Sequence, residues 1–291
     1  MKTSEELRTS LRAIDCGSYP AYKSLAGSWS FGKYMLHIEH VQGDPFAAPS
    51  QLSVTVDSRT AGFPAVCWEA SWNRTALEDY LLRRFGRQAG RFFRQAKGSG
   101  KSGVLAVTIP GQEVLERTDC EARSGRVTLR FEVGFPANGR TINARELEKI
   151  LFDFLPVCVE QGLLYASTPK EEVAKVIALA EDQHFIRTEL AKRGLAAFVA
   201  DGSILPRESG ASDRPMKDAV PFMAPDDLAM TLELPHLGLV RGMGIRRGIT
   251  LIAGGGYHGK STLLKALERG VYDHIAGDGR EYVITDATAM K

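Results

Sequence analysis

Residues 254–261 read Gly-Gly-Gly-Tyr-His-Gly-Lys-Ser, and this octapeptide decides how the C-terminal part of the chain is interpreted. It fits the phosphate-binding pattern G-x-x-x-x-G-K-[ST]. The preceding residues 248–253 (Gly-Ile-Thr-Leu-Ile-Ala) are mostly apolar and β-branched, which predicts a buried strand. Residues 261–269 (Ser-Thr-Leu-Leu-Lys-Ala-Leu-Glu-Arg) predict a helix that Gly270 stops. A strand, a glycine-rich loop and a helix, in that order, are the context in which such a loop binds phosphates.

The residue types of this loop suit a nucleoside triphosphate. Glycines let the backbone approach the phosphates closely, so that its N–H groups point at them, and the following helix adds the positive end of its dipole. We expect Lys260 to reach the β- and γ-phosphates and the Ser261 hydroxyl to hold Mg²⁺, which makes these two the candidate catalytic residues. The expected ATP-binding residues are Gly254, Gly255, Gly256, Tyr257, His258, Gly259, Lys260, Ser261 and Thr262. His258 is expected to be a loop side chain near the phosphates rather than a catalytic one.

Hydrolysis needs more chain than follows this loop. Residue 291 is the last, so 30 residues follow Ser261, too few to complete a nucleotide-hydrolysing domain. We therefore expect the chain to be a fragment or a truncated product, in which nucleotide binding is better supported than hydrolysis.

A second glycine-rich stretch, Gly98-Ser99-Gly100-Lys101-Ser102-Gly103, also contains Gly-Lys-Ser. Gln95 stands where the phosphate-binding pattern requires its first glycine, and a strand pattern (104–109) follows instead of a helix. This stretch is expected to be a flexible loop.

Composition is that of a globular protein, with 44% hydrophobic and 25% charged residues. We expect no membrane-spanning helix, because the chain has no apolar run of about 18 residues. Cys16, Cys67, Cys120 and Cys158 are far apart and form no C-x-x-C pair, which predicts reduced thiols in a cytoplasmic protein rather than a zinc site.

Along the chain, the patterns predict a mixed fold with a boundary near residue 165. Residues 1–165 are expected to form an α+β domain and residues 166–291 the beginning of an α/β nucleotide-binding domain. Helices are expected at 1–15, 143–155 and 169–193, strands at 30–41, 51–56, 126–133 and 228–234, and a long irregular connection at 200–226. Asp286 follows a strand-like run and is expected to be a turn residue.

One helix carries a row of positive charge. Thr75 and Glu78 have the spacing of a capping box, which predicts a helix that runs to about Lys97. At 100° per residue, one sector of this helix would hold Arg83, Arg87, Arg91, Arg94 and Lys97. The segment from Tyr80 to Gln112 contains neither Asp nor Glu. A row of charges of one sign favours binding to the phosphates of a nucleic acid. The alternative, which the sequence supports equally, is a charged helix face that lies in solvent.

Several stretches together resemble the predicted ABC-class ATPases, a family with its own N-terminal domain. They are His40–Ala47, Pro110–Thr118, Phe198–Arg207, Thr231–Leu264 and Gly277–Glu281, and the resemblance spans nearly the whole chain. It implies an ABC-type nucleotide-binding fold in which ATP lies between two subunits of a homodimer, and a link to RNA through a basic channel. The signature loop and the Walker B acid of that family would lie beyond Lys291.

Two alternatives remain open at this stage. One is a P-loop kinase for a small metabolite, although the Lys-Ser-Thr-Leu-Leu helix start favours the ABC interpretation. The other is a non-catalytic nucleotide-binding module.

Overall fold

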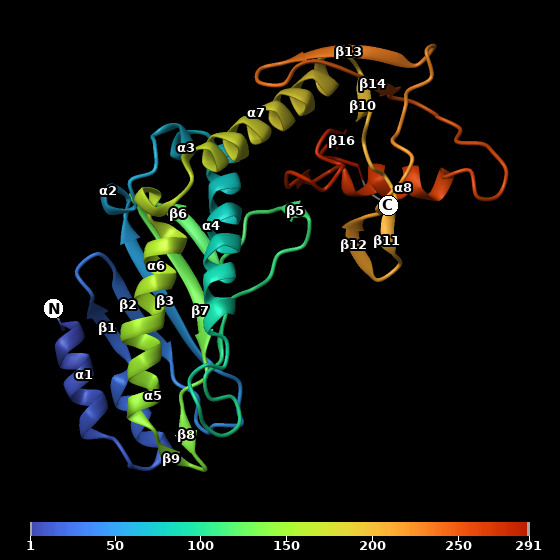
Figure 1. Cartoon of the computed structure of the whole chain (residues 1–291). Helices are drawn as coiled ribbons and strands as arrows, with labels where there is room; N and C mark the ends of the chain where they lie inside the picture. Colours follow the sequence, from blue (N-terminus) through green and yellow to red (C-terminus); the bar gives the residue numbers. More distant parts are fainter. Residues whose placement is uncertain (1, 290–291) are drawn as a thin grey trace. The chain divides into compact units, whose positions relative to one another are not determined.

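The computed structural model describes residues 2–289 and contains two compact units, both shown in Figure 1. The first comprises the residues up to Trp68 together with Leu77–Ile109 and Glu116–Lys170. The second comprises Glu69–Ala76, Pro110–Leu115 and the residues from Glu171 onward. Two short stretches from the first part of the sequence therefore fold with the second unit.

An antiparallel sheet forms the centre of the first unit. Its strand order is β1-β2-β3-β7-β4, and β6 also pairs with β7. The strands are β1 (Gly27–Ser30), β2 (Met35–His40), β3 (Ser50–Asp57), β4 (Leu105–Ala106), β6 (Cys120–Arg123) and β7 (Arg126–Val133). A small hairpin, β8 (Ala137–Asn138) with β9 (Thr141–Ile142), follows.

Alternation along β3 and β7 gives the sheet two different faces. Leu52 and Phe131 are buried on one face, where the Phe131 ring lies 5.6 Å from the Phe85 ring of α4 (Ser71–Phe92). The other face is polar: His37 hydrogen-bonds to Thr55, and Thr55 to Thr128. A sheet with one covered and one polar face is the usual antiparallel arrangement.

The remaining helices of the first unit lie mainly before the sheet and after it in the sequence. They are α1 (Ser4–Ala13), η1 (Tyr19–Leu25), α2 (Ser58–Ala61), α3 (Val66–Glu69), α5 (Ala144–Glu148), the π-helical η2 (Lys149–Phe154), α6 (Leu155–Leu163) and η3 (Tyr165–Ser167). Gly162 of α6 lies so close to α4 that a Cβ there would be 3.0 Å from the Phe85 Cα. Glycine therefore permits α6 to pack tightly against α4.

The second unit contains a four-stranded antiparallel sheet with the order β13-β14-β10-β16. Its elements are α7 (Lys170–Lys192), β10 (Leu195–Ala200), β11 (Arg207–Ser209), β12 (Ser212–Pro215), β13 (Ala229–Leu234), β14 (Gly238–Arg246), α8 (Lys260–Arg269), β15 (Asp273–His274) and β16 (Val283–Thr285). β11 pairs with β12, and β15 pairs with β5 (Glu113–Val114), one of the stretches that come from the first part of the chain.

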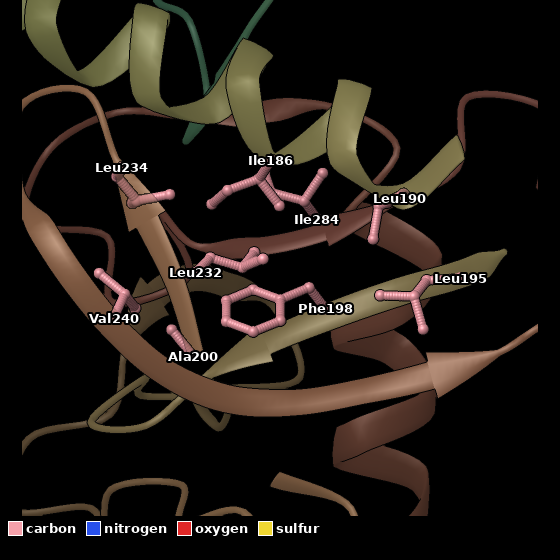
Figure 2. Packing of buried hydrophobic residues seen from close by; sticks show 9 residues of the cluster. All are labelled: Ile186, Leu190, Leu195, Phe198, Ala200, Leu232, Leu234, Val240 and Ile284. Carbon is pink, nitrogen blue, oxygen red and sulfur yellow. The ribbon is translucent and has the colours of Figure 1, made fainter. Parts of the chain in front are cut away.

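The core of this sheet packs against α7. Figure 2 shows Phe198 of β10 at the centre of a buried cluster with Ile186 and Leu190 of α7 and Ile284 of β16. Across the described helices, none is both long and apolar enough to cross a membrane.

Helix α4 differs from the prediction at both ends. It begins at Ser71, so Thr75 lies inside the helix, and Glu78 accepts a hydrogen bond from the Ala122 N–H instead of capping. It ends at Phe92 because Arg94 takes a left-handed conformation (φ 57°) and donates its N–H to the Gly103 carbonyl. Arg94 and Lys97 therefore lie beyond the helix.

The predicted flexible loop at 98–103 is closed by hydrogen bonds. The Ser102 hydroxyl donates to the Ser99 carbonyl and accepts from the Ala137 N–H, and the Lys101 N–H donates to Pro45. The predicted strand at 104–109 is reduced to Leu105–Ala106. The connection at 200–226, predicted as irregular, contains the β11–β12 hairpin.

The predicted buried strand at 249–253 is wrong. In the described structure this segment pairs with no strand, and Ile249 and Leu251 are 104% and 88% exposed. A buried strand needs neighbouring strands that take its backbone hydrogen bonds and elements that cover its side chains. In the described sheet, β13, β14, β10 and β16 pair with one another and none pairs with this segment.

Truncating Phe198 tests the core of the second unit. We expect Phe198→Ala to lower the free energy of unfolding by about 3–5 kcal/mol, because a fully buried ring leaves a cavity. Urea denaturation followed by circular dichroism measures the change. Leu239→Ala, on the exposed side of β14, is the control and should shift it by less than about 0.5 kcal/mol; equal shifts would contradict the packing described.

Candidate nucleotide-binding site

The glycine-rich loop is an open turn that leads directly into α8. Gly254 (φ 153°) and Gly259 (φ 74°) occupy backbone conformations that favour glycine, and Gly259 is the N-cap residue of α8. Tyr257 also has positive φ, 64°, and its side chain is fully exposed. Since the first N–H groups of any helix lack intrahelical partners, this turn presents donors and the positive end of a helix dipole to an anion.

Two side chains of the loop bond to its own backbone. The Lys260 ammonium donates to the Gly254 carbonyl at 2.6 Å and also to the Gly255 carbonyl. His258 Nδ1 accepts the Gly255 N–H at 3.1 Å, so the ring proton lies on Nε2. His258 thus helps to shape the loop. An anionic phosphate oxygen would form stronger, charge-assisted hydrogen bonds with Lys260 than these neutral carbonyls do.

Helix α8 is held along its inner side and at its C-terminal end. Ala266 is fully buried, and Leu263 and Leu267 pack against a cluster that includes Val283. The Thr285 hydroxyl donates to the Leu267 carbonyl at 2.7 Å. The loop end of α8 is exposed while the opposite end is fixed, so a ligand can reach the loop without displacing the core.

A buried charged cluster lies in the segment that follows α8. Asp278 is completely buried, accepts from the Arg207 guanidinium at 2.8 Å and faces His274 Nδ1 at 2.7 Å. Arg280 is 5% exposed and donates to the Leu205 carbonyl at 3.0 Å. Burial, together with the nearby Arg207 charge, lowers the pKa of Arg280 to about 10. The cluster fixes the segment after α8 to the β11–β12 hairpin.

Sequence reasoning did not identify this cluster as a unit. Arg207 lies in a stretch predicted as an irregular connection, and Asp278 lies in a stretch noted only for its resemblance, while no functional role was predicted for His274. The spacing of His274 and Asp278, four residues apart and close after the helix, was the available signal. Asp286, expected to be a turn residue after a strand, is one: it follows β16, and hydrogen bonds from Thr288, with help from Arg247, lower its pKa to about 2.

The five basic residues predicted to line one side of a helix do not form a continuous row. Arg83 is ion-paired at 2.6 Å with Asp79, the residue just before the acid-free segment; Asp79 also pairs with Arg117 at 2.6 Å, so it offsets only part of the Arg83 charge. Arg87 and Arg91 are exposed on α4, and the Arg91 guanidinium donates to Gln88. Arg94 and Lys97 are also exposed but lie in the turn beyond the helix. The structure therefore places four of the five predicted cations at the C-terminal end of α4 and just after it.

Two family models match the chain. One is described as "ATPase of the ABC class N-terminal" and matches residues 4–166; the other is a P-loop domain model for ABC ATPases and matches residues 169–291. The chain is also similar to "Uncharacterized protein MJ1628" of Methanocaldococcus jannaschii, with 35% identity over 118 residues. That alignment covers 38% of this chain and 26% of the relative, about a quarter of its length. The family matches confirm the resemblance inferred from the motifs and the mixed fold that it implied.

Removing the buried carboxylate should destabilise the second unit. We expect Asp278→Asn to lower the free energy of unfolding by about 3–5 kcal/mol, because it leaves the Arg207 guanidinium, 13% exposed, beside an uncharged amide. Guanidinium denaturation provides the measurement. Asp226→Asn, which removes a fully exposed partner of Arg241, is the matched control and should change the midpoint little. A midpoint for Asp278→Asn equal to that of the control would show that the cluster contributes no stability.

Proposed function

The chain belongs to the ATPases of the ABC class, and from that premise we propose that residues 254–262 bind ATP together with Mg²⁺. The observation that carries the proposal is the open loop at the N-terminus of α8, with Lys260 at the first helical position and its ammonium already over the loop. On phosphate binding, the ammonium would exchange the Gly254 and Gly255 carbonyls for phosphate oxygens. Ser261 and Thr262 follow in the first turn.

The proposed Mg²⁺ would have few protein ligands at this site. Within residues 2–289, no group of three or more His, Cys, Asp or Glu side chains is placed to hold a metal. Ser261 is exposed at the start of α8, so its hydroxyl would complete a cation shell built mainly from phosphate oxygens and water. The metal would supply charge neutralisation for the phosphates, and the chain's own part is to orient them.

Hydrolysis is a further step of the same proposal. The resemblance implies that two subunits close around ATP, so we propose a homodimer as the hydrolytic form. Ile249 and Leu251, next to the loop, are exposed apolar side chains. They support the proposal because further strands beside them would cover them. A protein that binds ATP but releases no phosphate would be a nucleotide-binding module instead.

RNA is the proposed partner of the basic residues around the end of α4. Arg87, Arg91, Arg94 and Lys97 are exposed, whereas Arg83 shares its charge with Asp79 and contributes less. Such a surface binds phosphates with little sequence preference. An exposed aromatic side chain lies beside it: the Arg94 guanidinium sits 5.5 Å from the Phe93 ring, which is 48% exposed. Rings of this kind can stack on unpaired bases, so single-stranded RNA suits the surface better than duplex.

Replacing the loop lysine tests nucleotide binding. We expect Lys260→Ala to weaken the affinity for ATP–Mg²⁺ at least about tenfold, equivalent to about 1.4 kcal/mol, because a charge-assisted contact to the phosphates is lost. Isothermal titration calorimetry measures the affinity. Lys265→Ala, an exposed lysine further along α8, should bind as the unsubstituted chain does. An unchanged affinity for Lys260→Ala would reject the loop as the phosphate site.

Replacing two arginines tests RNA binding. We expect the double variant Arg87→Ala, Arg91→Ala to bind a 20-nucleotide oligouridylate more weakly. The slope of log K against log salt should fall by about 0.7 for each phosphate contact removed. Fluorescence anisotropy at several salt concentrations gives both quantities. Arg59→Ala, at an exposed arginine of α2, is the control; an equal loss there would indicate a non-specific charge effect.

A further inference from the structure

Phe46, in the loop between β2 and β3, presents an apolar ring to solvent from a backbone that is held in place. It is 62% exposed, and its N–H donates to the Asp44 carboxylate at 2.9 Å. The loop rests on Gln42, which is 1% exposed. The Gln42 amide oxygen accepts the Ser50 and Phe135 N–H groups, each at 3.2 Å, and its amide nitrogen donates to the Asp44 carbonyl at 3.1 Å. A single exposed phenylalanine is common, but these buried hydrogen bonds fix the loop that carries this one.

The glycine-rich loop 98–103 lies against the Phe46 ring. Gly100 has φ 62°, and a Cβ there would clash with the Pro45 carbonyl oxygen and lie 2.9 Å from Cδ1 of Phe46. The Lys101 N–H donates to the same Pro45 carbonyl at 2.7 Å. Glycine is therefore required where the two loops meet, because a side chain at position 100 would displace the backbone or the ring. The contact places the exposed Lys101 beside Phe46.

The two loops continue the basic surface at the end of α4. The Gly103 carbonyl accepts the Arg94 N–H at 2.7 Å, so loop 98–103 is joined to the turn that follows the helix. At the β2–β3 loop, Arg140 is 80% exposed and pairs with the Asp44 carboxylate at 2.9 Å, which offsets the charge of that carboxylate. Figure 1 shows both loops near the β8–β9 hairpin. All of these residues belong to the first compact unit.

We propose that Phe46 stacks on an unpaired base of single-stranded RNA while Lys101 binds a phosphate of the same strand; this rests on the proposed function. The strand would run from the basic residues around the end of α4 across loop 98–103 to Phe46. An aromatic ring stacks on the face of any base, so the contact adds affinity without sequence preference. Because the loop already holds the ring, little conformational freedom is lost on binding. Duplex RNA keeps its base faces stacked on one another, so Phe46 selects single strands.

Replacing the ring tests the stacking. Fluorescence anisotropy gives the dissociation constants of a 20-nucleotide oligouridylate, an abasic strand of the same length and an RNA duplex. We expect Phe46→Ala to weaken oligouridylate binding about tenfold, the effect of losing one stacked base, and to leave the other two constants within about twofold. The slope of log K against log salt should not change, because an apolar ring releases no counterions. Phe46→Trp should bind oligouridylate as the unsubstituted chain does.

Lys101→Ala is the companion variant. It should lower the salt slope by about 0.7 and weaken oligouridylate and the abasic strand alike, because it removes a phosphate contact and no base contact. Ile109→Ala, which truncates another exposed apolar side chain of the first unit, is the matched control and should bind all three probes as the unsubstituted chain does. If Phe46→Ala does not fold, Phe46→Leu makes the same test, because it keeps an apolar side chain against Gly100 without a stacking ring.

Two results would overturn the stacking while leaving RNA binding in place. One is an unchanged affinity of Phe46→Ala for oligouridylate, and the other is an equal loss of affinity for the abasic strand. An unsubstituted chain that binds neither single-stranded probe would instead overturn the proposed function, and the stacking with it.

Discussion

Close contact between Gly270 and Thr285 is the constraint on which the proposed nucleotide site depends. A Cβ at Gly270 would lie 2.7 Å from the Thr285 hydroxyl oxygen and 2.8 Å from the Val283 carbonyl, so only glycine lets α8 end directly against β16. The Thr285 hydroxyl donates a hydrogen bond to the Leu267 carbonyl, and the Thr285 N–H donates to the Gly270 carbonyl at 2.8 Å. Thr285 therefore cannot move without breaking its contacts with the end of α8. The helix is therefore fixed where it meets the core and exposed where it meets the loop.

Buried charge extends this fixed end into the following segment. Asp278 is enclosed by Arg207 and His274, and Arg280 is held by the Leu205 carbonyl. Buried ionic groups of this kind contribute little net stability compared with an apolar core, but losing one partner is costly. They favour a single register of the segment between α8 and β16, and that register places β15 where β5 pairs with it.

Sequence reasoning predicted well where a local pattern decides the structure. The strand predicted at 126–133 matches β7, the helix predicted at 169–193 matches α7, and Gly270 ends α8. It failed where tertiary contacts decide. The end of α4 depends on an Arg94–Gly103 hydrogen bond between segments that fold back on each other, and no helical periodicity reports it. The Arg83–Asp79 pair was missed because the acid-free segment was counted from the next residue. The glycine-rich loop is recognisable from its motif, whereas the Arg207–Asp278 pair joins residues 71 positions apart and has no local signature.

The exposed segment 249–253 shows that the phosphate-binding motif can be present without the strand that was predicted to precede it. Its apolar, β-branched sequence is what a central strand requires, yet Ile249 and Leu251 face solvent in the described structure. Leaving two such side chains in water forgoes roughly 1.5–3 kcal/mol each, a large share of the stability of an ordinary domain. The loop beside them has the glycine conformations and the lysine position for phosphate binding without help from that strand. In the proposed function, nucleotide affinity and the geometry for hydrolysis would therefore depend on different parts of the site. The loop depends on α8 and its fixed end, whereas alignment of a reacting phosphate would depend on how the apolar segment is covered.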